Sequence, residues 1–297
     1  MYDVIIVGGG PAGLSAALIL GRCRRRTLIF DDCRYRNAGA PALHGFLTRD
    51  GLPPQELLRL GREQLAPYGV AVRNERVQQA AVCEDGFRIM LESGEALVSR
   101  KLLLATGVQD RIPSVPGIDE LYGRSVFHCP YCDAWEVRDQ ALGVYGKGPN
   151  AAGLALSLKT WSRDVVLCTD GSSRLAPADL ERLARHEVGI RTQRIRKLEG
   201  RNGVLERIVF DSGETLSRGA LFLSTGQTQR SDLAIQLGCK FTRKGAVLTG
   251  SLEGTNVPGL YVAGDASRDV QLAIVAAAEG AKAGFAINKA LDVQTRT

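Results

Sequence analysis

YDVIIVGGGPAG, residues 2–13, is the stretch that decides the fold. Its first half is a short apolar run rich in β-branched residues, which favours a buried strand, and the spacing of apolar residues then predicts a helix from Ala12 to Leu20. A second strand is expected over Thr27–Phe30, which ends in Asp31 and Asp32. Strand, glycine turn, helix, strand and acidic residue, in this order, are typical of a dinucleotide-binding βαβ unit.

The glycine turn itself carries the spacing G-x-G-x-x-G at Gly8, Gly10 and Gly13. In such turns the first glycine permits the tight bend, the second lets a pyrophosphate approach the backbone, and the third lets the helix pack closely. The N-terminus of the following helix stabilises the phosphate charge. In such units an acidic residue about 20 residues after the turn holds the ribose hydroxyls, and we expect Asp31, rather than Asp32, to do so here. The alternative for the glycines is a purely structural turn.

A similar pattern begins again after a proline-containing link at residues 112–117. A strand is expected over Ala141–Tyr145, a helix over Ala152–Trp161 and another strand over Asp164–Cys168, with Gly146, Gly148 and Ala151 in the turn. A later run, 220–226, echoes 102–107 and indicates where this second unit ends. The predicted fold is therefore α/β, with two Rossmann-like, three-layer ββα nucleotide-binding domains. The second, residues 113–232, is inserted into the first, residues 1–112 and 233–297.

Two of the seven cysteines, Cys129 and Cys132, are separated by two residues, a spacing that permits a small reversible disulfide ring. The other five stand far apart and are typical of thiols in a reducing compartment. A zinc site is the alternative, but no second CxxC and no paired histidines lie at zinc spacing. Redox exchange is the preferred interpretation, and no metal is expected.

The charge and hydrophobicity of the chain argue against two classes of protein, nucleic-acid binders and membrane proteins. The formal charge is +6 with a pI near 9.0, yet the basic residues are spread along the chain without a zinc-finger spacing or aromatic-rich motif, which argues against a nucleic-acid binder. No apolar run reaches the roughly 18 residues of a membrane span, and we read no secretory signal at the N-terminus. We therefore expect a cytoplasmic protein with no membrane partner.

The sequence resembles the low-molecular-weight thioredoxin reductase family. The matching segments follow the family's order: residues 8–13, Ala105-Thr106-Gly107, Cys129-Pro130-Tyr131-Cys132-Asp133, Ala263-Gly264-Asp265 and Gln271-Leu272-Ala273. The resemblance implies FAD as the cofactor. The residues expected to bind cofactor are Gly8, Gly10, Pro11, Ala12, Gly13, Asp31, Asp32, Asn37, Thr106, Gly107, Gly264, Asp265, Gln271, Leu272 and Ala273, with Gly146, Gly148 and Ala151 for a second nucleotide.

The same resemblance assigns catalytic roles. It implies that Cys129 exchanges with the substrate and that Cys132 faces the flavin. Asp133 would be the acid or base that protonates a departing thiolate; the alternative is that it only caps a helix. The resemblance further implies a homodimer and an inserted domain that rotates on its linkers, with thioredoxin or a small disulfide or dithiol as partner.

The sequence also departs from the family. NADPH-dependent members carry an arginine-rich cluster after the second strand of the insert, whereas this chain has Thr169-Asp170-Gly171-Ser172-Ser173-Arg174. An acidic strand end suits a free ribose better than a 2′-phosphate, so NADPH, NADH, ferredoxin or no such donor all stay open.

A second resemblance is to the flavin dithiol oxidases of holomycin-type and gliotoxin-type metabolites, which pass electrons to oxygen. It rests on residues 37–47 and on CPYC followed by Trp135-Glu136, although Asp133 stands where those enzymes carry histidine. Asn37 is as consistent with a turn as with a flavin contact. No proton-relay role is assigned to His44 or His128. A redox sensor without turnover is the non-enzymatic alternative.

Overall fold

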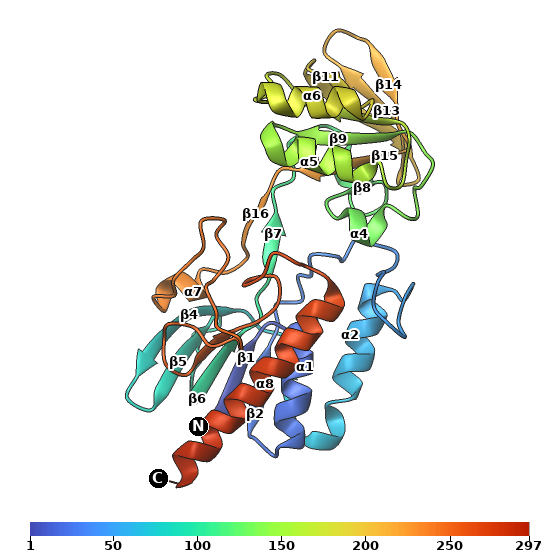
Figure 1. Ribbon diagram of the computed structural model, residues 1–297. Helices are drawn as coiled ribbons and strands as arrows, with labels where there is room; N and C mark the ends of the chain where they lie inside the picture. The colour runs from blue at the N-terminus through green and yellow to red at the C-terminus, as the bar shows by residue number, and fades with distance from the viewer. Residues whose placement is uncertain (297) are drawn as a thin grey trace. The chain divides into compact units, whose positions relative to one another are not determined.

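The computed structural model describes residues 1–296 and divides into two compact units. Unit 1 comprises Met1–Ala38, Gly45–Gln109 and the chain from Thr228 onward; unit 2 comprises Gly39–His44 and Asp110–Gln227. The fold class predicted from the sequence is confirmed: in each unit helices cover one face of parallel strands, and antiparallel strands either continue the same sheet, in unit 1, or form a second sheet, in unit 2 (Figure 1). Nothing in the sequence indicated that residues 39–44 group with unit 2.

Unit 1 is built on a sheet with the order β3-β2-β1-β6-β5-β4. Its strands are β1 (Tyr2–Val7), β2 (Thr27–Phe30), β3 (Ala71–Arg73), β4 (Val77–Cys83), β5 (Gly86–Leu91), β6 (Ala96–Leu104) and β17 (Leu260–Val262). β6 is long enough to pair with β5 in its first half and with β17 in its second, while β1 runs along its other edge. The carboxyl ends of β1, β6 and β17 therefore meet at one edge of the sheet.

Both faces of β1 are covered, which explains its continuous apolar sequence. Val4 and Ile6 belong to a core cluster that also includes residues of helices α1 (Pro11–Arg22) and α8 (Ala273–Arg296), while Ile5 and Val7 belong to the core on the opposite face. The two helices lie on the same side of the sheet (Figure 1). The remaining helices of unit 1 are α2 (Pro54–Glu63), the short 3₁₀ turn Ala66–Tyr68 and α7 (Leu233–Gln236).

Unit 2 repeats this plan with a parallel sheet of order β11-β10-β9-β15-β8 and an antiparallel sheet of order β12-β13-β14. The strands are β8 (Val126–Phe127), β9 (Leu142–Gly146), β10 (Val165–Cys168), β11 (Gly189–Arg191), β12 (Ile195–Arg201), β13 (Val204–Phe210), β14 (Thr215–Ser217) and β15 (Ala220–Ser224). The helices are α3 (Ile118–Leu121), α4 (Pro130–Asp133), α5 (Gly148–Leu158) and α6 (Pro177–Arg185). Two strands at the unit boundary, β7 (Val108–Asp110) and β16 (Gln227–Gln229), pair with each other.

One predicted helix is shifted. The sequence predicts a helix over Ala152–Trp161, but α5 begins at Gly148 and ends at Leu158. The last residues form a tighter turn instead, because Lys159 N–H donates to the Leu156 carbonyl at 3.2 Å and Thr160 N–H to the Ser157 carbonyl at 3.1 Å.

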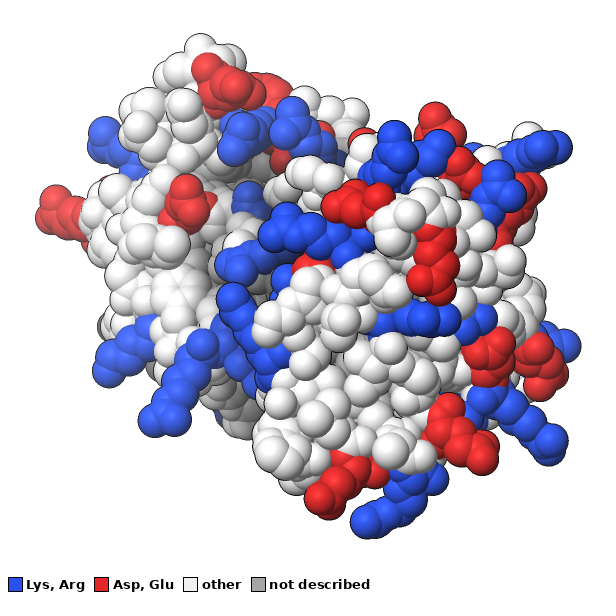
Figure 2. Space-filling model, turned by 90° about the horizontal axis from the view of Figure 1, so that it is seen from above, with Lys and Arg blue, Asp and Glu red and all other residues white. Residues whose placement is uncertain are grey.

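The charged surface is mixed. Lys and Arg side chains lie among Asp and Glu over much of the face that Figure 2 shows. Among residues 1–296, no helix has the length and apolar character needed to span a bilayer.

Candidate active site

Cys129 and Cys132 form a disulfide at the start of α4 in unit 2. Cys129 is the N-cap residue of this helix and Pro130 is its first residue. Proline is tolerated there because an N–H group at this position would have no hydrogen-bond partner within the helix. The two Cα atoms are 5.3 Å apart, within the usual range for a disulfide. Both cysteines are partly buried.

Asp133 is the last residue of α4, and this helix has no side-chain cap. Its position at the end of the helix does not fit the N-capping alternative. Burial raises the pKa of the Asp133 carboxyl to about 7, and the negative charge of Glu136 adds to the shift. A carboxyl that titrates near neutral pH, one residue from a redox cysteine, can both donate and accept a proton there.

A segment from outside the insert contributes to the same region. Gly39–His44 belongs to unit 2, and His44 Nε2 lies 3.4 Å from Glu136 Oε1. Glu136 in turn acts on the charge state of Asp133. His44 and Glu136 therefore extend the group of titratable side chains around α4, and sequence reasoning assigned a role to neither.

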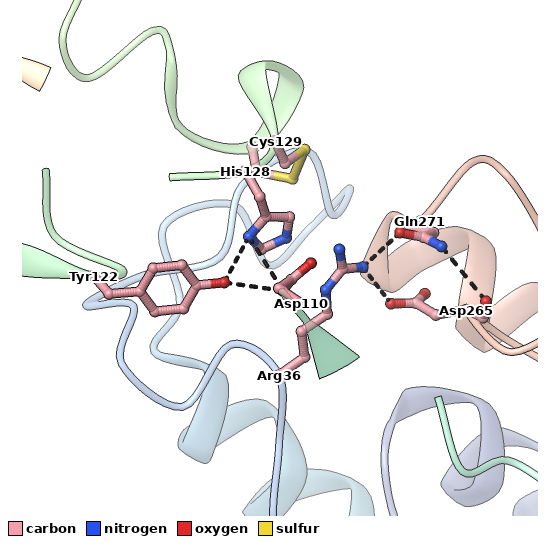
Figure 3. The surroundings of a disulfide bond; sticks show 8 residues. Arg36, Asp110, Tyr122, His128, Cys129, Asp265 and Gln271 are labelled. Atoms are coloured by element: carbon pink, nitrogen blue, oxygen red, sulfur yellow. Dashed lines mark hydrogen bonds and ion pairs between the residues drawn. A yellow bond between two sulfur atoms is a disulfide. The ribbon is translucent and has the colours of Figure 1, made fainter. Parts of the chain in front are cut away.

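On the other side of the disulfide, His128 directly precedes Cys129 and points toward Tyr122 and Asp110 (Figure 3). The Tyr122 hydroxyl lies 3.1 Å from His128 Nδ1 and donates to Asp110 Oδ2 at 2.9 Å, while Nδ1 is 3.5 Å from that carboxylate. The three side chains fix the backbone just before the redox pair. The sequence did not predict that Tyr122 and Asp110 belong to this group, because they are distant in the chain from the CxxC motif and from each other.

In unit 1 the glycine turn forms a cradle at the start of α1. A side chain at Gly8 would overlap the Ala105 carbonyl oxygen, and one at Gly13 would overlap the carbonyl oxygen of Gly8. Gly10, in contrast, faces open space, and α1 begins without a side-chain cap. An uncapped helix start beside open space fits a pyrophosphate.

The first of the two predicted ribose-binding aspartates is buried at the end of β2, where it is 3% exposed. The carboxylate of Asp31 accepts from the Tyr35 hydroxyl at 2.5 Å, from Arg62 Nη2 at 2.5 Å and from the Cys33 N–H at 3.2 Å. Asp31 is therefore fixed and charge-compensated beside the glycine turn, a role consistent with ribose binding. Tyr35 and Arg62 were missed, since neither belongs to a motif.

Asp32 and Asn37 occupy different surroundings. Asp32 accepts from the Arg34 N–H at 3.1 Å in a local turn, and Asn37 lies exposed in the turn that follows. The structure thus gives each of them a turn position, which leaves their contact with a nucleotide as a prediction.

The remaining predicted flavin segments come together at the carboxyl ends of β6 and β17. Thr106 and Gly107 follow β6, and Gly264 and Asp265 follow β17, whose end is bonded to β6 through Ala263 N–H and the Leu104 carbonyl at 3.1 Å. Three further residues of this group, Gln271, Leu272 and Ala273, lead into α8.

Arg36 links two of these segments. Its Nη1 donates to Asp265 Oδ2 at 2.9 Å and to Gln271 Oε1 at 2.6 Å, as Figure 3 shows. Gln271 also donates to the Arg268 carbonyl at 3.2 Å. Arg36 was not foreseen either, because its partners lie more than two hundred residues away, at separations of 229 and 235.

The second glycine turn, in unit 2, differs from the first. The backbone N–H of Gly148, at the start of α5, donates to the carbonyl of Ser173 at 2.8 Å. A side chain at Gly146 would come within 3.0 Å of Ala151 Cβ, so these two positions pack against each other. The Gly148 amide, which in such turns is free to bind a phosphate, is therefore already hydrogen-bonded to the loop that contains Ser173.

Asp170, at the acidic strand end, is also engaged. Its Oδ1 accepts from the Ile195 N–H at 2.8 Å and its Oδ2 from the Tyr145 hydroxyl at 3.1 Å. Burial, followed by the charge of Asp170, raises the pKa of Tyr145 to about 12. The Asp170 carboxylate is therefore engaged in contacts within unit 2, as the Asp31 carboxylate is in unit 1.

Replacing Gly13 with alanine is expected to remove FAD binding, because the added methyl group would overlap the Gly8 carbonyl and force α1 away from the turn. Alanine at Gly10, which faces open space in the protein alone, should leave the fold intact. The measurement is flavin content per chain after purification, with the circular dichroism melting curve as the control for folding. Normal flavin content in the Gly13 variant would contradict the assignment of this glycine turn to FAD.

Comparison with known proteins agrees with this geometry. The family model for pyridine nucleotide-disulphide oxidoreductases matches residues 2–280. The thioredoxin reductase tcpT of Claviceps purpurea is 33% identical over 279 residues, which cover 89% of this chain and 86% of that protein. Among solved structures, a putative thioredoxin reductase TrxB from Bacillus anthracis superposes with a TM-score of 0.93 at 32% identity, covering 99% of this chain and 100% of the other. A structure of HlmI has a TM-score of 0.94 at 34% identity, with coverages of 99% and 95%.

Proposed function

The chain belongs to the pyridine nucleotide-disulphide oxidoreductase family, and from this premise we propose that Cys129 and Cys132 carry electron pairs between FAD and a disulfide substrate. The protein is an FAD-dependent thiol–disulfide oxidoreductase of the thioredoxin reductase type. The observation that supports the site best is the Cys129–Cys132 disulfide with the near-neutral carboxyl of Asp133 beside it.

We assign the flavin nucleotide to the cradle of unit 1. Gly8, Gly10 and Gly13 would admit its pyrophosphate at the start of α1, and Asp31 would hold the ribose. The Gly264-Asp265 segment and the start of α8 would bind the rest of the molecule. When bound, FAD supplies two-electron chemistry that links an electron donor to a disulfide.

The protein's own residues account for the thiol steps. Two electrons and two protons convert the Cys129–Cys132 disulfide into two thiols. The Cys129 thiolate then attacks one sulfur of the substrate disulfide, forms a mixed disulfide and releases one substrate thiolate. The Cys132 thiolate attacks Cys129 Sγ, which releases the second substrate thiolate and restores the original disulfide. Asp133 supplies a proton to a departing thiolate.

A second candidate function is the reverse flow, from a dithiol substrate to oxygen. One observation favours it: the Gly148 N–H is bonded to the Ser173 carbonyl, and Asp170 is bonded to Ile195 and Tyr145, so the nicotinamide-type turn of unit 2 is partly occupied by the chain itself. A nucleotide phosphate that bound the Gly148 amide would have to displace the Ser173 carbonyl. The reductase stays the first candidate, because Asp133 replaces the histidine expected of the oxidases.

Anaerobic reduction of the flavin separates the two directions. NADPH, NADH, reduced ferredoxin and a dithiol are added separately to the purified protein, and the loss of the visible absorbance of the oxidised flavin is followed in time. For the reductase we expect a nicotinamide or ferredoxin to bleach the flavin fastest. If only the dithiol does so, and oxygen restores the colour, the oxidase direction is correct.

For the substrate we propose thioredoxin or a small-molecule disulfide. Ferredoxin is the proposed redox partner in the reductase direction, and oxygen in the oxidase direction.

A homodimer and a cytoplasmic location are further proposals that rest on the family resemblance and on the spread-out cysteines. Sedimentation of the purified protein tests the dimer: a single species with the mass of one chain would contradict it.

A further inference from the structure

A buried network of charged side chains lies behind the Gly264-Asp265 segment in unit 1. Glu253 is 0% exposed, and Glu279 is 5% exposed. Arg268 pairs with both carboxylates, through Nε to Glu279 Oε1 at 2.8 Å and through Nη2 to Glu253. Lys282 Nζ lies 2.6 Å from Glu253 Oε1. Two carboxylates thus face two cations, which makes burial of the charges tolerable.

The side chain of Glu279 contacts the backbone of the Gly264-Asp265 segment directly. Glu279 Oε2 accepts the backbone N–H of Gly264 at 2.8 Å. Gly264 adopts a φ of +81°, a conformation that favours glycine, and its carbonyl accepts the Ser267 N–H at 2.9 Å. The direction of the chain entering Asp265 is therefore set on one side by Glu279.

The helix that carries Glu279 also touches the glycine turn. The next residue, Gly280, packs so closely on α1 that a side chain there would overlap the backbone of Ala12. A side chain at Gly264 would lie 3.2 Å from Ala12 Cβ and 3.6 Å from Ala276 Cβ. A single turn of α8 thus contacts the pyrophosphate turn through Gly280 and the Gly264-Asp265 segment through Glu279.

We propose that Glu279 is a positioning residue for FAD: its carboxylate, held by Arg268, orients the Gly264 amide and so places Asp265 for the cofactor. The proposal rests on the assignment of Gly264 and Asp265 to the flavin. Glu253 stabilises the same network but, through its carboxylate, contacts Arg268, Lys282 and Thr249 rather than Gly264.

The matched variants are Glu279→Gln and Glu253→Gln, which each remove one buried carboxylate from the network. Glutamine at 279 offers one acceptor oxygen to two donors, and the charged guanidinium of Arg268 takes it, so the Gly264 N–H loses its partner. We expect FAD to bind about ten-fold or more weakly in Glu279→Gln, the effect typical of losing a hydrogen bond to a charged group. Glu253→Gln should change FAD affinity by less than about three-fold, although both variants unfold at lower denaturant concentration.

The measurement is the fluorescence of FAD released on dilution of each holoprotein, which gives its dissociation constant. Unfolding midpoints measured at several FAD concentrations separate the structural cost from the part that follows from weaker FAD binding. Equal weakening in both variants, or none in Glu279→Gln, overturns the proposal. Asp265→Ala is the reference: if it weakens FAD binding while Glu279→Gln does not, only the positioning role fails, and if it has no effect, the assignment of this segment to the flavin is wrong.

Discussion

Replacing either Cys129 or Cys132 with serine should lower disulfide turnover on the order of a thousand-fold or more, because the two sulfurs act as one unit and neither can complete the exchange alone. The two variants should nevertheless differ in what they accumulate. Cys132→Ser keeps the attacking thiol of Cys129, which is the N-cap residue of α4. It should therefore trap the substrate as a mixed disulfide, whereas Cys129→Ser should not.

Mass spectrometry of the intact protein after incubation with a substrate disulfide detects the trapped species, and a steady-state assay measures turnover. Cys23→Ser is the matched control, since Cys23 is a free and exposed cysteine outside the site. It should keep normal turnover. Trapping in the Cys129 variant instead would reverse the assigned order of attack, and substantial turnover in either variant would disprove the mechanism.

The features that the sequence predicts correctly are those specified by residues close together in the chain. The glycine turn, the strands β1 and β2 and the CxxC pair are specified within a few residues, so their prediction needed no knowledge of distant contacts. The α/β class with an inserted second Rossmann-like unit followed from the repetition of this local pattern, and it is confirmed.

The surroundings of the site were less predictable, because they depend on contacts between distant segments. Arg62 reaches Asp31 across 31 residues, and Arg36 reaches Gln271 across 235. Glu279 contacts Gly264 from the second turn of α8. Arginine and glutamate are common on protein surfaces, so their type alone gave no indication that these would contact the predicted cofactor segments.

The second glycine turn shows a different limit of sequence reasoning. Gly146, Gly148 and Ala151 have nearly the same spacing as the first turn, yet the Gly148 amide is bonded to Ser173. A motif specifies the local backbone, whereas the availability of its amides depends on the loop that packs against it. The acidic residue Asp170 did point to an unusual second site, but not to its structural use by Ile195 and Tyr145.

Asp133→Asn is expected to slow turnover by about 10² to 10⁴-fold, the usual contribution of a positioned acid or base. The acid is active while protonated, and the pKa of Asp133 is raised to about 7 by burial and by Glu136. Reductase activity of the natural protein should therefore fall as the pH rises through about 7. The asparagine variant should lack this pH dependence, and Glu136→Gln should move it to lower pH by removing a negative charge.

Above neutral pH the same Asp133→Asn substitution should raise the stability of the fold while it lowers the activity. The carboxyl has a pKa of 3.8 in its unperturbed state and about 7 in the folded protein, so its protonated form is favoured by folding. Its contribution is fully present below about pH 4 and is lost as the pH rises through 7. At pH 8 asparagine avoids the buried negative charge, and we expect the variant to be more stable by roughly 2 to 4 kcal/mol.

Chemical unfolding at pH 4 and pH 8, combined with pH–rate profiles, checks both halves of this expectation. A variant that is more stable at pH 8 yet nearly inactive identifies Asp133 as a group whose unfavourable burial serves proton transfer. Unchanged activity would instead leave the carboxyl with no part in the exchange, and lower stability at pH 8 would show that its charged form is stabilised by contacts with the rest of unit 2.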